Sequence, residues 1–145
     1  MSNELSSQDF NLLIKGLIEA YQSTSFNVFE PAISIKVGQK NQLLDDLLQL
    51  HHSDSWTYIT AWNPLSEIQS DEINQLKNNE LKQDLKHYII LDGEGIGEGP
   101  AWKPEKSFLV LGINKEESIA LGNKYRQHAI VFGEINKAPE LLWLS

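Results

Sequence analysis

Cysteine is absent from this sequence, and so are long hydrophobic runs. Without cysteine the chain has no disulfide bond, no thiolate metal site and no cysteine nucleophile. No apolar run approaches the roughly 18 residues of a membrane-spanning helix, and the polar, acidic segment 1–9 is not typical of a signal peptide. We therefore expect a cytoplasmic protein with no membrane partner.

Positive charge is also scarce. The chain has 12 Lys and Arg against 20 Asp and Glu, which gives a net charge of −8 at pH 7. A surface of that sign repels nucleic acid and anionic membranes in general, and no basic stripe offsets it. A nucleic-acid partner is therefore disfavoured, although a local basic pocket is compatible with this charge.

The remaining composition is typical of one globular domain. The chain has 145 residues, of which 41% are hydrophobic and 22% are charged, values close to globular averages. No internal repeat or Pro/Gly/Ser linker divides it. We expect a single domain over 1–145, with a flexible segment at 1–8.

Apolar residues at helical spacing predict four helices. They are, in order, a helix over 10–21 after a cap at Ser6, a short helix around 43–48, one capped by Ser70 and one capped by Asn114. The third helix is expected to bury four aliphatic residues, which are Ile73, Leu76, Leu81 and Leu85.

β-branched and aromatic runs predict six strands. They fall at 33–37, 56–62, 88–91, 107–113, 130–132 and 141–144. The order mixes crossover units with hairpin-like pairs, which predicts an α+β (or α/β) fold. We expect a mixed β-sheet of about five or six strands with about four helices packed on it.

The glycine-rich segment 92–99 invites comparison with phosphate-binding and calcium-binding loops. Its spacing matches neither Gly-x-Gly-x-x-Gly nor Walker A, and the segment is acidic. Ile96 and Lys103 stand where an EF-hand needs oxygen ligands. Two interpretations stay open: a flap over a site, or a plain connection between two strands whose pairing is undecided because the loop is long.

A series of motifs carries a family resemblance. Its centre is Thr60-Ala61-Trp62-Asn63-Pro64, followed by Ser66. Further matches are Tyr21, Thr24, Asn74, Asn78, Leu81, Leu85, Gly95, Gly97, Trp102, Glu105, Ser107, the strand at 109–113, Tyr125, Gln127 and Ala129. The series resembles a mostly bacterial family, domain of unknown function 3293, over roughly residues 20 to 133.

This resemblance implies a shared domain but no reaction and no cofactor, because the family has no established activity. One position departs from its pattern. Lys77 stands where the family has an arginine, and lysine keeps the positive charge but lacks the planar fork for bidentate contacts.

The first candidate cluster lies at the end of the strand predicted over 56–62. In open α/β sheets, ligands gather outside the carboxyl ends of strands, so Thr60, Trp62 and Asn63 are candidate ligand-binding residues. Asn63 offers amide contacts and Trp62 a stacking surface. The helix capped by Ser70 would point its free N–H groups, which favour carboxylate or phosphate, toward the same place.

Asn74, Lys77 and Asn78 extend this cluster, since spacing of i, i+3 and i+4 puts them on one helix face. We interpret them as ligand-binding residues. In the alternative interpretation they form an ordinary solvated face, Asn63 makes only an Asx turn before proline, and Trp62 belongs to the core.

The second candidate cluster is the segment 102–107. Glu105 is the candidate catalytic residue, as a general base or a hydroxyl acceptor, while Trp102 and Ser107 are candidate ligand contacts. Ser107 is not a nucleophile, because no Gly-x-Ser-x-Gly elbow surrounds it. Gln127 can join either cluster. The alternative is that Glu105 pairs with a neighbouring lysine and Gln127 ties backbone together.

Together these residues predict a pocket for a small polar or nucleotide-like ligand at the Trp62-Asn63 strand end. The prediction requires Asn63, Lys77 and Glu105 to converge. The alternative function is a non-catalytic protein-interaction or regulatory module, and the sequence does not decide whether the protein is an enzyme. No metal site is predicted, because the adjacent histidines 51–52 do not share a helix face.

Overall fold

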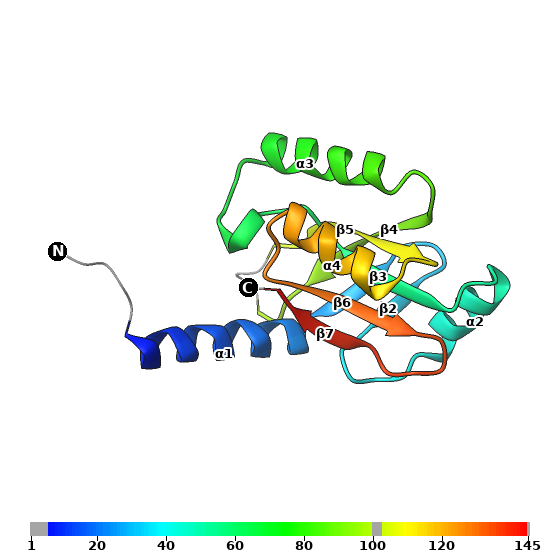
Figure 1. Ribbon diagram of the computed structural model, residues 1–145, viewed down its shortest axis with the longest axis horizontal. Helices are drawn as coiled ribbons and strands as arrows, with labels where there is room; N and C mark the ends of the chain where they lie inside the picture. The colour runs from blue at the N-terminus through cyan, green and yellow to red at the C-terminus, as the bar shows by residue number, and fades with distance from the viewer. Residues whose placement is uncertain (1–5, 100–102, 145) are drawn as a thin grey trace.

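Seven strands form one sheet in the computed structural model of the protein, which describes residues 6–99 and 103–144 (Figure 1). From one edge to the other the strands are β2 (Ile33–Ile35), β1 (Ser25–Val28), β4 (Ile89–Ile96), β5 (Glu105–Leu111), β3 (Ser55–Ile59), β6 (Ala129–Glu134) and β7 (Glu140–Trp143). Each pair of neighbours is antiparallel.

The α+β class is confirmed, but the sheet differs from the expected mixed sheet of five or six strands. The additional strand is β1, a run of four residues. The three strand–helix–strand crossovers join β2 to β3, β3 to β4 and β5 to β6. None of these pairs is adjacent in the sheet. The crossovers therefore create no parallel pair, as in split β-α-β units.

The expected four helices are α1 (Ser7–Ser23), α2 (Gln42–Leu50), α3 (Asp71–Asp84) and α4 (Lys115–Lys124), with a 3₁₀ turn η1 at Pro64–Ser66. A side chain caps the start of each helix: Ser6, Asn41, Ser70 and Asn114 accept a hydrogen bond from the backbone three residues on. The predicted caps at Ser6, Ser70 and Asn114 are confirmed. Of the segment 1–8 expected to be flexible, residues 1–5 lie outside the described part.

The helices cover both faces of the sheet, so the core has two layers. Side chains alternate between the faces along β5, where Leu109 and Leu111 face one way and Phe108 and Val110 the other. The first face packs against α2 through Leu44, Leu47 and Leu48. The second packs against residues of α3 and α4, among them Leu81 and Leu121.

Helix α3 turns a different side to the sheet from the one expected. Its buried residues are Asn74, Asn78 and Leu81, whereas Ile73 and Leu76 are 44% and 62% exposed. The expectation for Ile73 and Leu76 is wrong because both asparagines find hydrogen-bond partners beneath the helix. Buried amides are tolerated when they are hydrogen-bonded.

The glycine-rich segment is mostly strand. β4 runs through Gly93 and Gly95 and pairs with β5 up to Gly95 opposite Glu105, which decides the undecided pairing. A Cβ atom on Gly93 would lie 1.9 Å from the carbonyl oxygen of Asn27 in β1. Glycine therefore allows the close approach of β1 and β4 at this point.

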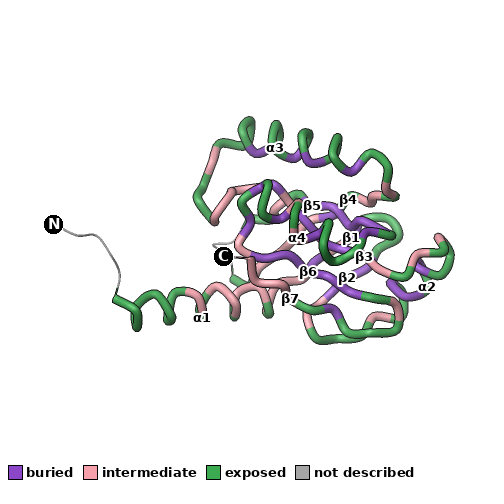
Figure 2. The backbone as a smooth tube through the Cα atoms, viewed as in Figure 1, coloured by how far each residue is buried: buried purple, intermediate pink, exposed green. Residues whose placement is uncertain are grey.

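Helix α1 projects away from the sheet, and only its inner end contacts the body of the molecule (Figures 1 and 2). None of its residues is buried. Phe10, Leu12 and Leu13 in its outer half are each at least half exposed. Across residues 6–99 and 103–144, no helix has the length and apolar character to cross a membrane.

Candidate functional site

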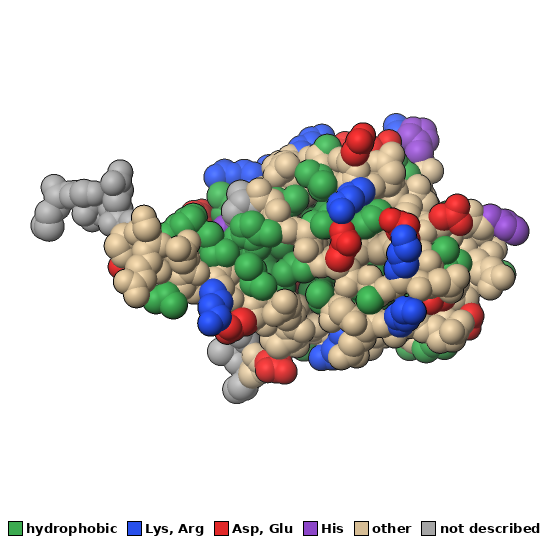
Figure 3. All heavy atoms as spheres, turned by 60° about the horizontal axis from the view of Figure 1, so that its bottom comes forward, with side chains coloured by type: hydrophobic (Ala, Val, Ile, Leu, Met, Phe, Trp, Pro, Cys, Tyr) green, Lys and Arg blue, Asp and Glu red, His purple; other side chains and the backbone are tan. Residues whose placement is uncertain are grey.

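A cavity of about 170 Å³ lies between the inner end of α1 and the first face of the sheet. Leu17, Ala20 and Tyr21 of α1 form one wall, and Phe26 and Tyr58 lie on the sheet side. Hydrophobic side chains gather on the surface where α1 meets the body (Figure 3).

Six of the residues singled out in the sequence line this cavity, and they come from separate segments. They are Thr60, Trp62, Asn63, Glu105, Ser107 and Gln127. Asn74, Lys77 and Asn78 are not among the lining residues. Trp102 lies outside the described residues. Most of the predicted convergence therefore involves the strand ends and not the face of α3.

The chain turns sharply after Trp62. β3 ends at Ile59, three residues earlier than predicted, and the backbone is left-handed at Asn63 (φ 45°), Leu65 (φ 53°) and Ser66 (φ 60°). Asparagine tolerates this region, whereas leucine and serine adopt it at a cost. The backbone N–H of Leu65 donates to the carbonyl oxygen of Arg126 at 2.7 Å, which helps to hold the turn.

Asn74 fixes the start of this turn. Its Oδ1 accepts a hydrogen bond from the backbone N–H of Asn63, and its Nδ2 donates to Oδ1 of Asn63, both at 2.8 Å. The same Oδ1 of Asn63 accepts from the backbone N–H of Gln69 at 3.0 Å. Because its Oδ1 is engaged in this way, Asn63 turns its Nδ2 toward Glu105.

Asn78 holds the preceding residues against β5. Its Oδ1 accepts from the backbone N–H of Ala61 at 2.8 Å, and its Nδ2 donates to the carbonyl oxygen of Lys106 at 2.9 Å. Thr60 donates through its hydroxyl to the same carbonyl oxygen at 2.6 Å. Asn74 and Asn78 thus position the Thr60–Asn63 backbone from outside the cavity.

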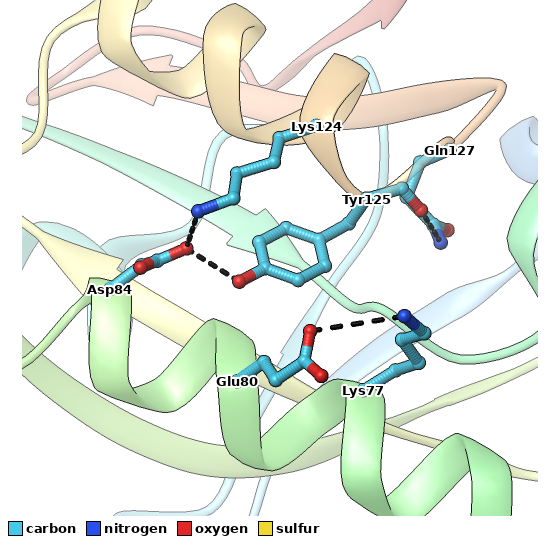
Figure 4. Close-up of polar contacts among 6 residues, drawn as sticks. All are labelled: Lys77, Glu80, Asp84, Lys124, Tyr125 and Gln127. Atoms are coloured by element: carbon cyan, nitrogen blue, oxygen red, sulfur yellow. Dashed lines mark hydrogen bonds and ion pairs between the residues drawn. The ribbon is translucent and has the colours of Figure 1, made fainter.

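Lys77 lies on the exposed side of α3. Its Nζ pairs with the Glu80 carboxylate at 3.8 Å, and both side chains are largely solvent-accessible (Figure 4). An exposed pair of this kind contributes little to stability. The expected convergence therefore brings Asn63 and Glu105 into contact, with Lys77 elsewhere.

Glu105 is the acidic centre of the cavity. Its side chain is half-buried and accepts a hydrogen bond from Nδ2 of Asn63 at 3.4 Å. Burial raises the pKa of the Glu105 carboxyl above its ordinary value of 4.5, and the Asn63 amide partly opposes that shift. The carboxyl therefore keeps its proton to a higher pH than an exposed glutamate does.

Two tyrosines share the cavity with Glu105. Burial, and then the Glu105 charge, raise the pKa of Tyr21 to about 12, while a hydrogen bond with Ser66 opposes the shift. Tyr58 donates through its hydroxyl to the carbonyl oxygen of Asn27 at 2.7 Å, and burial raises its pKa as well. Both phenols thus stay protonated at neutral pH.

Ser107 and Gln127 complete the polar lining. The Ser107 hydroxyl donates to the Glu105 carbonyl oxygen at 2.9 Å. Nε2 of Gln127 donates to the Tyr125 and Trp62 carbonyl oxygens at 3.2 and 3.4 Å. Gln127 therefore ties backbone together, as the alternative interpretation describes, while also lining the cavity.

The site predicted from sequence lacked Tyr21 and Tyr58. Tyr58 is two residues before Thr60, so period-2 alternation along a strand put it on the same face. Tyr21 is the last apolar residue of the first helix face. The strand alternation and the helix-face pattern were both visible in the sequence. Neither pattern distinguishes a tyrosine that lines a cavity from one that is packed in the core.

A second polar cluster lies between α3 and α4. Asp84 accepts hydrogen bonds from the Tyr125 hydroxyl and from Nζ of Lys124, the latter at 2.7 Å (Figure 4). These two contacts lower the pKa of the Asp84 carboxyl, with Lys124 the larger cause. In the part of the chain that the structure describes, no three His, Asp or Glu side chains gather as metal ligands would.

The fold and the cavity define an α+β domain with an antiparallel sheet and a pocket beneath its first helix. Residues 59–130 match the family described as "Protein of unknown function (DUF3293)", which confirms the resemblance seen in the sequence. This segment of the chain is similar to that family. No curated protein and no solved structure matches the chain.

The matched segment covers only part of the cavity. It contains the strand-end and β5 residues, such as Asn63 and Glu105, together with Asn74 and Asn78. It does not contain the α1 wall with Leu17 and Tyr21. The polar side of the pocket therefore lies within the family segment, and the helical wall lies before it.

Proposed function

We propose that this protein binds a small ligand in the cavity between α1 and the sheet. One observation carries the proposal: Asn63 and Glu105, 42 residues apart, contact each other at the cavity wall. Thr60, Ser107 and Gln127 line the same space. A mostly apolar pocket with a few convergent polar groups is the usual form of a small-molecule site.

Backbone strain supports the same location. Leu65 and Ser66 both hold left-handed φ angles beside the cavity, and Ser66 lines it. Residues in such conformations cost of order 1–3 kcal/mol each and cluster at functional sites. The strained turn is held from two sides, by Arg126 and by Asn74.

The size and charge of the cavity favour a ligand smaller than a nucleotide. Its volume of about 170 Å³ lies below the roughly 300–1,000 Å³ of common ligand pockets. Glu98 and Glu105 line it against a single lysine, Lys103. The two carboxylates would repel a phosphate group here. We therefore propose a small polar ligand and not a nucleotide-like one.

The test is a fragment and metabolite screen by thermal shift, confirmed by amide chemical-shift changes in ¹H–¹⁵N spectra. A ligand selective for the native state raises the melting temperature. Ala20→Trp would fill the cavity from α1 and should abolish the shift, whereas Glu80→Gln, on the exposed side of α3, should preserve it. Hits that survive Ala20→Trp would place binding elsewhere and contradict the proposal.

Glu105 is also the residue to test for catalysis. Its raised pKa suits a general base, and it lines the cavity directly. Once a ligand is known, turnover should be lost in Glu105→Gln even at ligand concentrations that saturate the variant. We place this function in the bacterial cytoplasm, in line with the family resemblance and the sequence composition.

A protein-interaction module is the second candidate, and the outer half of α1 favours it. Phe10, Leu12 and Leu13 are 52%, 60% and 51% exposed, and exposed apolar patches often mark interaction sites. Light scattering and affinity capture with Phe10→Ser/Leu13→Ser would test it. Unchanged mass and an unchanged set of captured proteins would count against this candidate.

A further inference from the structure

We infer that the ligand of this cavity carries a cationic group, a protonated amine, which pairs with the Glu105 carboxylate. The inference rests on the proposed function, since it names the chemical class of the ligand for the same site. It depends on the pairing of Glu105, on the aromatic lining and on the balance of charge around the cavity.

Three carboxylates among the described residues each pair closely with a lysine, whereas Glu105 does not. Nζ of Lys124 lies 2.7 Å from Asp84, Nζ of Lys115 lies 2.8 Å from Glu140, and Nζ of Lys137 lies 3.1 Å from Glu134. These pairs are all substantially exposed. The half-buried Glu105, in contrast, has no cation within ion-pair distance among the described residues.

The single hydrogen bond that the Glu105 carboxylate receives from the described residues does not replace a cation. The Asn63 amide donates at 3.4 Å, which is at the long end for an N–H···O contact. A carboxylate removed from water needs a charged partner or several short hydrogen bonds. An ammonium group offers three donors and a full positive charge, so it supplies what the cavity wall does not.

The aromatic residues of the lining favour the same class of ligand. Tyr21, Phe26, Tyr58 and Trp62 border the cavity that contains Glu105. The faces of aromatic rings attract cations, and more strongly when the cation is desolvated. A cavity with a half-buried carboxylate and several rings therefore favours an ammonium group over an anion or a neutral polar group.

The charges at the rim do not reverse this preference. Lys103 and Glu98 both line the cavity, and both are exposed. With Glu105 the three groups sum to −2 + 1 = −1, within a chain of net charge −8. An exposed lysine at the rim is well screened by solvent, whereas Glu105 faces the ligand from a half-buried position.

The experiment compares benzylamine with benzyl alcohol, which share shape and differ in charge at pH 7. Both are titrated into the protein and followed by ¹H–¹⁵N chemical shifts of cavity residues. We expect wild type and Glu80→Gln to bind benzylamine at least tenfold more tightly than benzyl alcohol. Glu105→Gln, checked for folding by its spectrum, should lose most of this preference. Glu80→Gln is the matched control because it makes the same change outside the cavity.

A second readout needs no variant. Saturating benzylamine should lower the pKa of the Glu105 carboxyl, followed by its ¹³C chemical shift, because a bound cation favours the ionised form. Benzyl alcohol should not lower it. This measurement keeps the inference testable even if Glu105→Gln does not fold.

The outcomes separate the inference from the proposed function. Equal or tighter binding of benzyl alcohol, a preference that survives in Glu105→Gln, or no binding of benzylamine at the cavity would each overturn the cationic ligand. The fragment screen would then decide whether the cavity binds a ligand at all. A neutral or anionic hit lost in Ala20→Trp would keep the pocket while rejecting the amine.

Discussion

The side chain of Asn74 holds Asn63 at two atoms, accepting from its backbone N–H and donating to its side-chain oxygen. Asn74 is 1% exposed, so water cannot readily replace either bond. The contact joins the first turn of α3 to the turn that places Asn63 beside Glu105. Several consequences of this arrangement, and of the sheet beneath it, can be measured.

Asn74→Ala should destabilise the protein by about 2 kcal/mol, because it leaves the partly buried backbone N–H of Asn63 without its partner. Asn79→Ala is the control, since Asn79 lies on the exposed side of the same helix and its side chain accepts a hydrogen bond from the exposed Gln75. It should cost less than about 0.5 kcal/mol. Urea denaturation of both variants measures the difference, and equal effects would argue against the role of Asn74.

Gly93→Ala should be severely destabilising or prevent folding. The new Cβ atom would meet the Asn27 carbonyl oxygen at 1.9 Å and the Tyr58 hydroxyl at 2.9 Å. Both atoms are fixed by their mutual hydrogen bond, so β1 would have to move away, at a cost of about 3 kcal/mol or more.

Gly95→Ala provides the matched control in the same strand. Its Cβ atom would meet only Phe26 and Thr24 side-chain atoms at 3.9 Å, an ordinary contact distance. We expect a change of less than about 1 kcal/mol in the free energy of unfolding. Thermal and urea denaturation of the pair would show whether one specific glycine, and not glycine content, is required.

Glu105→Gln should be more stable than wild type at neutral pH, and the gap should narrow as the pH falls. Burial raises the native pKa of Glu105 above 4.5, so the native state binds this proton more tightly than the unfolded state. The resulting stability is present below the unfolded pKa and is lost as the pH rises through the native pKa. Glutamine does not titrate. A stability difference that stays constant with pH would contradict this.

Tyr125→Phe should cost about 0.5–1 kcal/mol, the lower part of the range for a hydrogen bond, because the Asp84 acceptor is reached by solvent. The ring itself remains in the core. Tyr88→Phe is the control, since its ring packs against the same core and no hydrogen bond from its hydroxyl is seen within the described residues. A larger loss in Tyr88→Phe would contradict the role of the Asp84 contact.

The Asp84 contact also has a pH dependence of the opposite sign to that of Glu105. Lys124 and Tyr125 lower the pKa of Asp84, so its contribution is present above the unfolded pKa and is lost as the pH falls through the native one. The stability difference between wild type and Tyr125→Phe should therefore shrink in acid. A difference that grows in acid would exclude this explanation.

Local sequence patterns were enough to predict the helices and the α+β class. Ser6, Ser70 and Asn114 cap helices because side-chain capping depends on residues only three positions apart. The strand order was not predictable in this way. Whether β5 lies between β3 and β4 depends on contacts between distant segments, and β1 has only two apolar residues, Phe26 and Val28, to indicate a strand.

The candidate site, too, was predictable only where it depends on local sequence. The motif at 60–64 indicated where to look, and the contact of Asn63 with Glu105 lies there. Spacing alone could not show that α3 turns its asparagines inward, because i, i+4 periodicity describes a polar exposed face and a hydrogen-bonded buried face equally well. Lys77 lies about 100° around the helix from Asn78, and its side chain reaches solvent, where it pairs with Glu80.

The attachment of α1 has a thermodynamic consequence. Its inner end forms a wall of the cavity, yet none of its residues is buried. Any ligand that touches Leu17 or Tyr21 adds contacts to a helix that has few of its own. Occupancy of the cavity and retention of α1 on the sheet are therefore linked equilibria, and each must strengthen the other by the same free energy. Slower amide hydrogen exchange along α1 would then report a bound ligand.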